Sequence, residues 1–364
     1  MTSICKSFCL IIFSFLLLSC ASTDYNKNTF PMAVFLPIEN SQFGAISQDM
    51  LNAMNLAVEE INEAGGINGK PLALVIKSSK EDDSFDSGKR LQSLIDSGIK
   101  IFHVGFTNQI VLEHKLLGQN PDIFVNYLSG YPSAVVLNNN SVRIFLNGAQ
   151  EGELMAKAVE LLPADHNVEK VMITTGVDDF LGKSCCDYLL FHLRTENVKC
   201  YNDVYPYAEK NFDVFAQQCD RLNANYFFMF GYGESEKALL NSLIKEKFKG
   251  LFVTNCGFHD DVEGTVPANI AFYKVSTLYQ NNKIDSLENK KFKVKYKSRF
   301  GKTPDWYAAY AYDSIILTAQ AANSGSTIAD YKNFFVNKTF SGAIGKIKFD
   351  SAGDSLSELE LVRK

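Results

Sequence analysis

Short apolar runs alternate along this chain with longer segments in which apolar residues recur at helical spacing. After the N-terminal segment, residues 32–37 form an unbroken apolar run, and residues 51–61 carry an apolar series three or four positions apart. The run predicts a strand that is buried on both faces, and the series predicts an amphipathic helix. The glycines at 65–66 predict the end of this helix, because glycine readily adopts the left-handed conformation of a helix C-cap.

The alternation continues as far as residue 275. Further strands are predicted over residues 72–76, 101–104, 123–126, 141–146, 170–174, 198–204, 226–230, 251–254 and 271–275. Further helices are predicted over residues 87–95, 109–117, 152–162, 182–196, 212–222 and 235–246. Strands that alternate with longer helices are the signature of an α/β fold with parallel sheets. A chain of 364 residues also exceeds the size at which a single hydrophobic core stops growing, which predicts two domains.

The N-terminus has the pattern of a bacterial secretory signal. A short segment with one positive charge, Lys6, precedes an apolar run over residues 8–18. This run is too short to cross a membrane, since a spanning helix needs about 20 apolar residues. It ends in Leu17-Leu18-Ser19-Cys20, which resembles the lipobox, a motif whose cysteine receives a diacylglycerol and becomes the first residue after cleavage. The alternative is a plain secretory signal with an incidental cysteine.

We therefore expect a signal peptide over residues 1–19, a lipid on Cys20 and a polar tether over residues 20–29. The protein would then lie in the cell envelope, anchored by lipid to a membrane and facing the periplasm or the cell exterior. Removal of the signal takes away Lys6 and changes the formal net charge from −5 to −6. An acidic protein argues against a nucleic-acid partner, because binding to phosphates rests on basic patches.

Five cysteines remain after the signal and the lipidated residue are set aside: Cys185, Cys186, Cys200, Cys219 and Cys256. Their number is odd, so at least one thiol stays free or pairs with another chain. The adjacent pair at 185–186 is compatible with redox or metal chemistry, but no C-x-x-C or H-x-x-x-H spacing accompanies it. We expect structural cysteines, either buried or linked in disulfides whose pairing is open.

Three later stretches carry longer motifs. Residues 56–70 read LAVEEINEAGGINGK, residues 300–313 read FGKTPDWYAAYAYD, and residues 340–350 read FSGAIGKIKFD, with Gly353-Asp354 completing the last motif. These stretches resemble the leucine/isoleucine/valine-binding protein family, the type I periplasmic binding proteins of ABC transporters. They follow one another in the family's order and, with the lipobox ahead of them, extend over essentially the whole chain.

The resemblance implies two Rossmann-like lobes with parallel central sheets, joined by a hinge of three crossover strands. We expect residues 30–146 and 276–340 to form the first lobe, and residues 147–275 and 341–364 to form the second. The resemblance also implies a monomer without a cofactor that binds a small molecule and delivers it to ABC permease subunits.

The loops that follow the predicted strands are the candidate binding site, because ligands of open α/β sheets bind beyond the carboxyl ends of the strands. The candidate ligand-binding residues are Phe43, Thr107, Asn108, Ser129, Gly130, Tyr131, Phe180, Tyr232, Glu234 and Phe258. The resemblance implies that residues 106–108 offer a hydroxyl and a backbone contact to a ligand carboxylate. It also implies ligand contacts from residues 129–131, where the family usually has Ser-Ala-Thr and this chain has Ser-Gly-Tyr.

One expected side chain is missing from these loops. Amino-acid receptors of the family commonly carry a glutamate for the ligand ammonium near residues 256–259, and this chain has none there. A buried ammonium needs such a partner, because burying an unpaired charge is very costly. The acids nearest to the candidate loops are Asp178, Asp179, Glu234 and Asp260. The aromatic residues of the loops leave a small amide, a modified amino acid or an aromatic metabolite open as the ligand.

The sequence has no P-loop, no G-x-G-x-x-G after a strand and no G-x-S-x-G elbow, and its five histidines lack metal-ligand spacing. We therefore predict no enzyme activity, no catalytic residues and no metal site. The leading hypothesis is the ligand-binding lipoprotein of an ABC importer for an amino acid or similarly small polar metabolite. The alternatives are an envelope lipoprotein that acts through protein contacts and a sensory receptor that signals to a membrane kinase.

Overall fold

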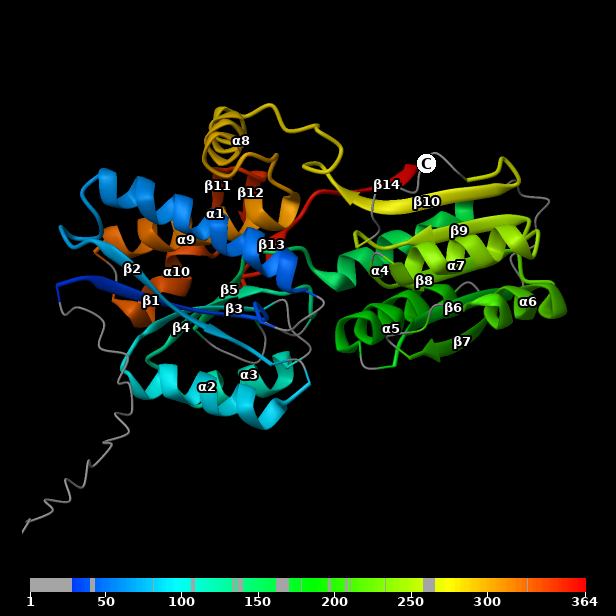
Figure 1. The fold of residues 1–364 in the computed structure, drawn as a ribbon, viewed down its shortest axis with the longest axis horizontal. Coiled ribbons are helices and arrows are strands. Elements are labelled where there is room, and N and C mark those ends of the chain that lie inside the picture. The colour runs from blue at the N-terminus through cyan, green and yellow to red at the C-terminus, as the bar shows by residue number, and fades with distance from the viewer. Residues whose placement is uncertain are drawn as a thin grey trace, which may run out of the picture.

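The structure is a computed structural model that describes most of the chain after residue 27. The described residues are 28–39, 43–80, 82–105, 109–132, 135, 140–161, 170–177, 179–195, 198–206, 209, 211–232, 234–257, 266–325 and 327–364. Two lobes lie side by side, each with a central sheet that helices cover on both faces (Figure 1). The predicted signal peptide and the lipidated Cys20 lie outside the described residues.

The first lobe is built on five parallel strands in the order β2-β1-β3-β4-β5. The strands are β1 (Phe30–Leu36), β2 (Leu72–Ser78), β3 (Ile101–Gly105), β4 (Phe124–Leu128) and β5 (Ser141–Arg143). One face is covered by α1 (Gly44–Glu63), α9 (Trp306–Asn323) and α10 (Tyr331–Phe335), and the other by α2 (Ser84–Asp96) and α3 (Ile110–Gly118). Successive residues of β1 enter different cores, Val34 under α1 and Phe35 under α2, which explains the unbroken apolar run.

The second lobe is built on six strands in the order β14-β10-β9-β8-β6-β7. The strands are β6 (Lys170–Gly176), β7 (Lys199–Tyr205), β8 (Tyr226–Phe230), β9 (Gly250–Thr254), β10 (Ile270–Thr277) and β14 (Leu359–Arg363). All neighbours pair in parallel except β14, which runs antiparallel to β10. The helices are α4 (Gly148–Ala156) and α5 (Phe180–Thr195) on one face, and α6 (Asp213–Leu222) and α7 (Glu234–Lys245) on the other.

A small third sheet, β11-β12-β13, packs against the first lobe. Its strands are β11 (Thr339–Gly342), β12 (Gly345–Phe349) and β13 (Ser355–Leu356). Phe349 of β12 meets Phe335 of α10 edge to face, and Asp313 of α9 accepts the backbone N–H groups of Ala343 and Ile344. The sequence analysis assigned residues 341–364 to the second lobe, because the chain was expected to cross back to that lobe near residue 341. We propose instead that the boundary lies between β13 and β14, since only β14 pairs with the second sheet.

The chain passes between the lobes in three places: after β5, after β10 and after β13 (Figure 1). The lobe boundaries at residues 146 and 275 that the sequence analysis gave stay predictions. The predicted strand over 141–146 ends earlier, at Arg143, because Ile144 donates its N–H to the Asn126 side chain of β4 instead of to a backbone carbonyl of that strand. The helix predicted to begin at 152 begins at Gly148, where the Asn147 side chain accepts the N–H of Ala149 as an N-cap.

A buried ion pair joins the first and last passages between the lobes. The guanidinium of Arg143, which is fully buried, donates from Nε and Nη2 to the two oxygens of Asp354, each over 2.6 Å. Asn147 donates to Asp354 over 2.7 Å, and the Ser355 hydroxyl donates to the Phe145 carbonyl over 2.7 Å. The end of β5, the start of α4 and β13 are therefore held together by polar contacts in a buried position.

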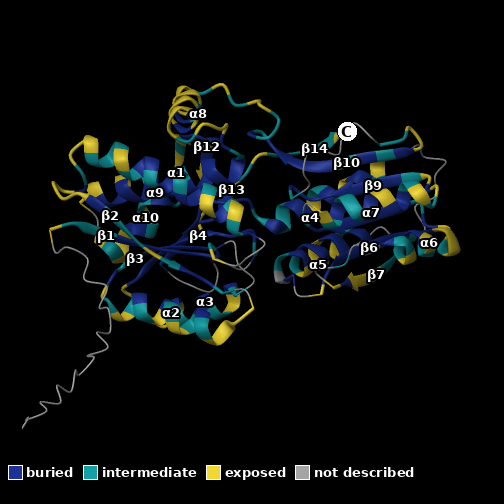
Figure 2. Cartoon of the chain, viewed as in Figure 1, coloured by how far each residue is buried: buried dark blue, intermediate teal, exposed yellow. Residues whose placement is uncertain are grey.

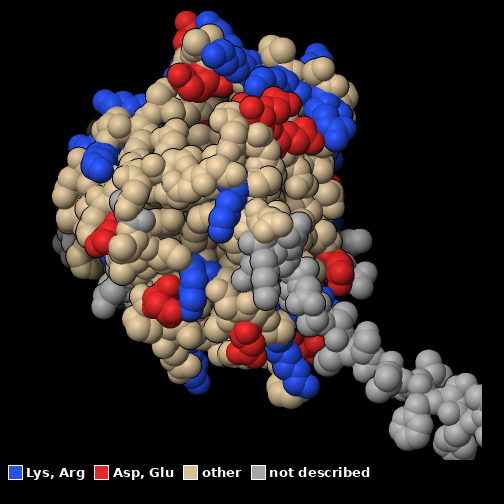
Figure 3. Space-filling model, turned by 90° about the vertical axis from the view of Figure 1, so that its left-hand side faces the viewer, with Lys and Arg blue, Asp and Glu red and all other residues tan. Residues whose placement is uncertain are grey.

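Burial and charge follow the layered architecture. The inner strands of both sheets are buried, whereas the edge strand β7 and the outward faces of the helices are largely exposed (Figure 2). Basic and acidic side chains lie next to one another along the upper edge of the first lobe in Figure 3. At this edge α8 (Leu287–Phe300) lies on α1. There Lys295 pairs with Glu60 over 3.0 Å and Arg299 with Glu59 over 3.4 Å. Within the described part of the chain, no helix is both long and apolar enough to span a bilayer.

Replacement of Arg143 by Met should lower the free energy of unfolding by about 3–5 kcal/mol, because the Asp354 carboxylate would stay buried without its partner. Replacement of Lys157 by Met, which removes only the exposed pair with Glu153, should cost less than about 1 kcal/mol. Urea denaturation of both variants measures the two values. If both replacements lower the free energy of unfolding by the same amount, the buried pair stabilises the fold no more than the exposed pair does.

Candidate ligand-binding cleft

A pocket lies between the two lobes, beyond the carboxyl ends of both sheets. From the first lobe and the first passage it is lined by Phe43, Ile110, Ser129, Gly130, Tyr131, Phe145, Leu146, Trp306 and Tyr307. From the second lobe it is lined by Glu151, Leu181, Tyr232, Asn255, Cys256 and Gly257. The space among these side chains, including the part open to solvent, is about 560 Å³.

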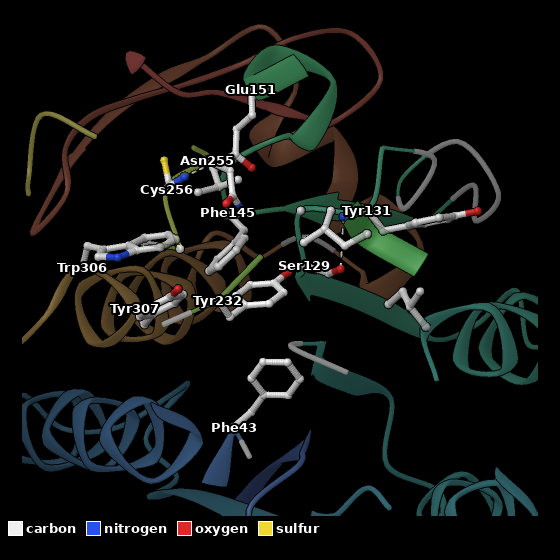
Figure 4. Close-up of a pocket in the computed structure, with 15 residues that line it drawn as sticks. Phe43, Ser129, Tyr131, Phe145, Glu151, Tyr232, Asn255, Cys256, Trp306 and Tyr307 are labelled. Atoms are coloured by element: carbon white, nitrogen blue, oxygen red, sulfur yellow. Dashed lines mark hydrogen bonds between the residues drawn. The ribbon is translucent and has the colours of Figure 1, made fainter. Parts of the chain in front are cut away.

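Two aromatic rings meet across the gap between the lobes. Phe43 stands just before α1 in the first lobe, and Tyr232 follows β8 in the second. Their ring centroids are 5.4 Å apart and the ring planes are 80° from parallel, which is a favourable edge-to-face contact (Figure 4). The lobes are therefore close enough for direct contact at the mouth of the pocket.

The remaining aromatic wall comes from the start of α9 and from the first passage between the lobes. Asp305 caps α9 by accepting the N–H of Ala308 over 2.7 Å, which fixes the first helical turn and the rings of Trp306 and Tyr307. The ring centroid of Phe145 lies 5.4 Å from that of Trp306 and 6.2 Å from that of Tyr307. Trp306 and Tyr307 were not among the predicted site residues, because α9 begins far from any strand end along the sequence. Phe145 was not among them either, because it fell inside the predicted strand over 141–146.

The loop that follows β4 is held from behind by Arg143. Its Nη1 donates to the carbonyls of Ser129 and Tyr131 over 3.3 and 2.6 Å, and its Nη2 donates to the carbonyl of Pro132 over 3.1 Å. Inside the loop, the Tyr131 N–H donates to the Ser129 hydroxyl over 3.2 Å. The position of Ser129 in the pocket thus depends on the same guanidinium that binds Asp354.

Glu151, in the first turn of α4, supplies the carboxylate of the pocket. Its side chain is 1% exposed and extends toward Cys256, whose N–H donates to Oε1 over 2.9 Å (Figure 4). Burial raises the pKa of Glu151 to about 7. A second buried acid nearby, Asp179, caps α5 by accepting the N–H of Gly182 over 2.8 Å, and burial raises its pKa to about 6. Among the described residues that line the pocket, none is Lys, Arg or His.

Comparison with known proteins decides the family. Residues 33–357 match the periplasmic binding protein family. The chain belongs to this family. It is 20% identical over 345 residues to Leu/Ile/Val-binding protein homolog 1 of Brucella abortus, with 86% of this chain and 84% of the relative covered.

Solved structures show the same fold. The leucine-binding protein LivK of Thermotoga maritima superposes with a TM-score of 0.77 at 15% identity, covering 92% of this chain and 98% of LivK. An ABC-transporter solute-binding protein of Rhodopseudomonas palustris, solved with 3,4-dihydroxybenzoic acid, gives a TM-score of 0.74 at 17% identity and covers 93% of both chains. The protein therefore has the type I periplasmic binding protein fold, as its sequence motifs predicted, and its family is one of solute-binding proteins.

This periplasmic binding protein brings five of the predicted site residues together: Phe43, Ser129, Gly130, Tyr131 and Tyr232. Glu234 does not line the pocket; it is exposed as the first residue of α7. Phe180 begins α5, but its side chain is not described, and Thr107, Asn108 and Phe258 lie outside the described residues. Whether any of these residues binds a ligand stays a prediction.

Glu151 also lines the pocket, although it was not among the predicted site residues. It lies on a helix that follows a passage between the lobes, whereas the predicted site residues were expected in loops after strands. Cys185, Cys186, Cys219 and Cys256 are free thiols in the described chain, and Cys256 is the one of these four that lines the pocket. No cluster of metal-ligating side chains occurs among the residues that the structure describes.

The stability of this binding protein should depend on pH through Glu151. The pKa of Glu151 is about 7 in the folded protein and about 4.3 in the unfolded protein. Between these two pH values the folded state binds a proton that the unfolded state does not bind, so the folded state becomes more stable as the pH falls. The free energy of unfolding of the wild type, relative to that of Glu151→Gln, should therefore increase by roughly 1–3 kcal/mol when the pH is lowered from 8 to 5. The comparison is made by denaturation of both proteins at each pH.

Burial lowers the pKa values of His103 and His114, so these residues also make the stability depend on pH. Both residues are present in the wild type and in Glu151→Gln, so their effect cancels in the difference between the two free energies of unfolding. A difference that stays constant with pH would show that the pKa of Glu151 is the same in the folded and unfolded protein, and a change in the opposite direction would show that folding lowers it; either result would contradict the prediction.

Proposed function

We propose that this protein is the ligand-binding lipoprotein of an ABC importer, and that it captures an amino acid or similarly small polar metabolite between its two lobes. The observation that carries the proposal is the pocket beyond the carboxyl ends of both sheets, lined from both lobes. Backbone groups at strand ends and helix N-termini converge at such a place, which suits the binding of polar groups. The names of the relatives support the amino-acid class and include an aromatic acid as an alternative.

Capture would proceed by closure of the lobes about the three passages. The ligand binds the open protein and stabilises the closed one, so an existing equilibrium between the two shifts toward closure. The contact between Phe43 and Tyr232 joins the lobes and would be made only in the closed protein. The permease subunits would then recognise the closed form.

The ligand would have an apolar body of modest size. Phe145, Trp306 and Tyr307 form one wall of the pocket, and Leu146 and Leu181 add aliphatic surface. The side chains of Ser129 and Asn255 offer hydrogen-bond donors and acceptors between these apolar surfaces. An apolar lining with a few polar groups that fix orientation is the usual composition of a small-molecule site.

An envelope protein that acts through protein contacts, or a sensory receptor, is the second candidate. It is supported by Tyr131, which lines the pocket where the related amino-acid receptors usually carry a small hydroxyl residue. The envelope protein would keep the two-lobed fold without a small ligand in its cleft, whereas the sensory receptor would pass its closed state to a membrane kinase.

A thermal-shift screen of residues 21–364 against amino acids, amides and small aromatic acids tests the proposal. A ligand at 100 times its Kd should add about 2.7 kcal/mol to the free energy of unfolding and raise Tm. Tyr232→Ala and Ser129→Ala should reduce the shift, while Tyr188→Ala, which removes an exposed ring on α5, should leave it unchanged. A folded protein that responds to no compound would favour the envelope protein that acts through protein contacts.

The lipid anchor is tested by Cys20→Ser in the full-length chain expressed in a bacterium. Loss of the lipidated thiol should move the protein from the membrane fraction to the soluble fraction and prevent labelling by a palmitate analogue. If the variant stays with the membrane and is still labelled, the segment ending at Cys20 is not a lipobox.

A further inference from the structure

The third passage between the lobes consists of two residues. β13 ends at Leu356 and β14 begins at Leu359, so Ser357 and Glu358 alone connect the small sheet to the second lobe (Figure 1). Leu356 is paired with β12 on the first lobe, and Leu359 is paired with β10 in the second. When the angle between the lobes changes, the backbone dihedral angles of residues 357 and 358 therefore have to absorb the change in this passage.

A hydrogen bond holds Ser357 to the first lobe. Its hydroxyl oxygen lies 3.1 Å from that of Tyr310 on α9, and the two groups share a hydrogen bond. Tyr310 is 3% exposed, and its ring centroid lies 5.2 Å from that of Phe145 and 5.8 Å from that of Trp306, two rings of the cleft wall. One buried side chain therefore connects the wall of the cleft with the residue at which the third passage bends.

The two hydroxyls border a second pocket, which lies at the hinge. It is lined by the second and third passages and by the small sheet, and its volume is about 950 Å³, including the part open to solvent. Ser357 thus has room to move away from Tyr310, and water can hydrate both hydroxyls after they separate. A hydrogen bond that is exchanged with water in this way typically changes an equilibrium constant by a factor of about 3–10.

We propose that Tyr310 is a positioning residue for ligand capture, because its hydrogen bond with Ser357 forms in the closed protein and breaks when the lobes open. The bond biases the equilibrium toward closure from outside the cleft, since Tyr310 is not among the described residues that line the cleft. The inference rests on the proposed closure of the lobes. Loss of the bond should lower the ratio of closed to open protein about 3–10-fold, and should weaken a ligand that binds the closed form by up to the same factor.

Trp306 offers a direct measurement of this ratio. It is the single tryptophan of the chain, it lines the cleft, and it is 6% exposed. Opening of the lobes should bring its ring into contact with water. The tryptophan emission should then move to longer wavelength and acrylamide should quench it more strongly. Small-angle X-ray scattering measures the opening independently, as a larger radius of gyration.

The test variants are Tyr310→Phe and Ser357→Ala in the protein without ligand, each of which removes one hydroxyl of the pair. Both should increase acrylamide quenching and the radius of gyration, and the double variant should do so no more than either single one, because the same bond is lost. Ser357→Ala leaves the aromatic wall itself unchanged, so a change in its fluorescence reports the opening and not a new neighbour of Trp306. Ser357→Thr keeps a hydroxyl and should behave as wild type.

The matched control is Ser341→Ala. Ser341 borders the same hinge pocket, but its hydroxyl donates over 3.0 Å to Glu288, which lies on α8 of the same lobe. This bond does not cross the hinge, so its loss should leave quenching and scattering at the wild-type values. Circular dichroism and thermal unfolding show whether each variant is folded, and Ser357→Ala decides if Tyr310→Phe is not.

A merely structural role of Tyr310 would lower Tm while quenching and scattering of the folded variants stay at the wild-type values, and that result overturns the inference. Effects of the two single variants that add in the double variant overturn it as well, since the two hydroxyls would then act independently.

Calorimetric titration with leucine and with 3,4-dihydroxybenzoate separates this inference from the proposed function. The Kd of a probe that binds should increase in Tyr310→Phe and in Ser357→Ala, and stay constant in Ser341→Ala. A probe that binds all variants equally, with no opening of the protein, overturns the role of Tyr310 and leaves the receptor role standing. If the variants open the protein and neither probe binds, the role of Tyr310 in closure stands and the proposed amino-acid or aromatic-acid ligand class fails.

Discussion

The bidentate pair between Arg143 and Asp354 is the contact on which the hinge and the cleft both depend. These residues stand 211 positions apart, one at the end of β5 and the other just before β13. Because the guanidinium is completely buried, every one of its donors needs an acceptor, and three backbone carbonyls of residues 129–132 provide the remaining ones. One side chain therefore fixes the crossing of two chain segments and the shape of the loop that carries Ser129.

The second physical constraint is the position of the cleft at the carboxyl ends of two sheets. Parallel strands of both lobes end there, so loops from each lobe approach one another, and Phe43 and Tyr232 come into contact. Helix starts contribute the remaining groups, Glu151 from α4 and the Trp306 ring from α9. The result is a pocket with aromatic walls, a buried acid and the architecture of a two-lobed receptor.

Much of this fold could be predicted from the sequence because its elements are long and strongly periodic. The strand that begins at Phe30 and the helix that follows it were located by apolar patterning, and the motif over 300–313 placed α9 in the family pattern. The stretch from 341 to 356 was less predictable. Its short strands have no strong period, and their attachment to the first lobe depends on contacts such as Asp313 with the Ala343 amide, 30 residues away.

The sequence by itself determined the α/β class, the order of strands and helices, and the loops after the strands, which included Ser129 and Tyr232. These features follow from local patterns, since burial and backbone conformation repeat with the period of each element. Only the tertiary structure decided that Glu151, Phe145 and Trp306 share one pocket, and that Arg143 is held by Asp354. The physical reason is that a cavity is formed by packing between distant segments, and no local pattern records which distant side chain will occupy the facing position.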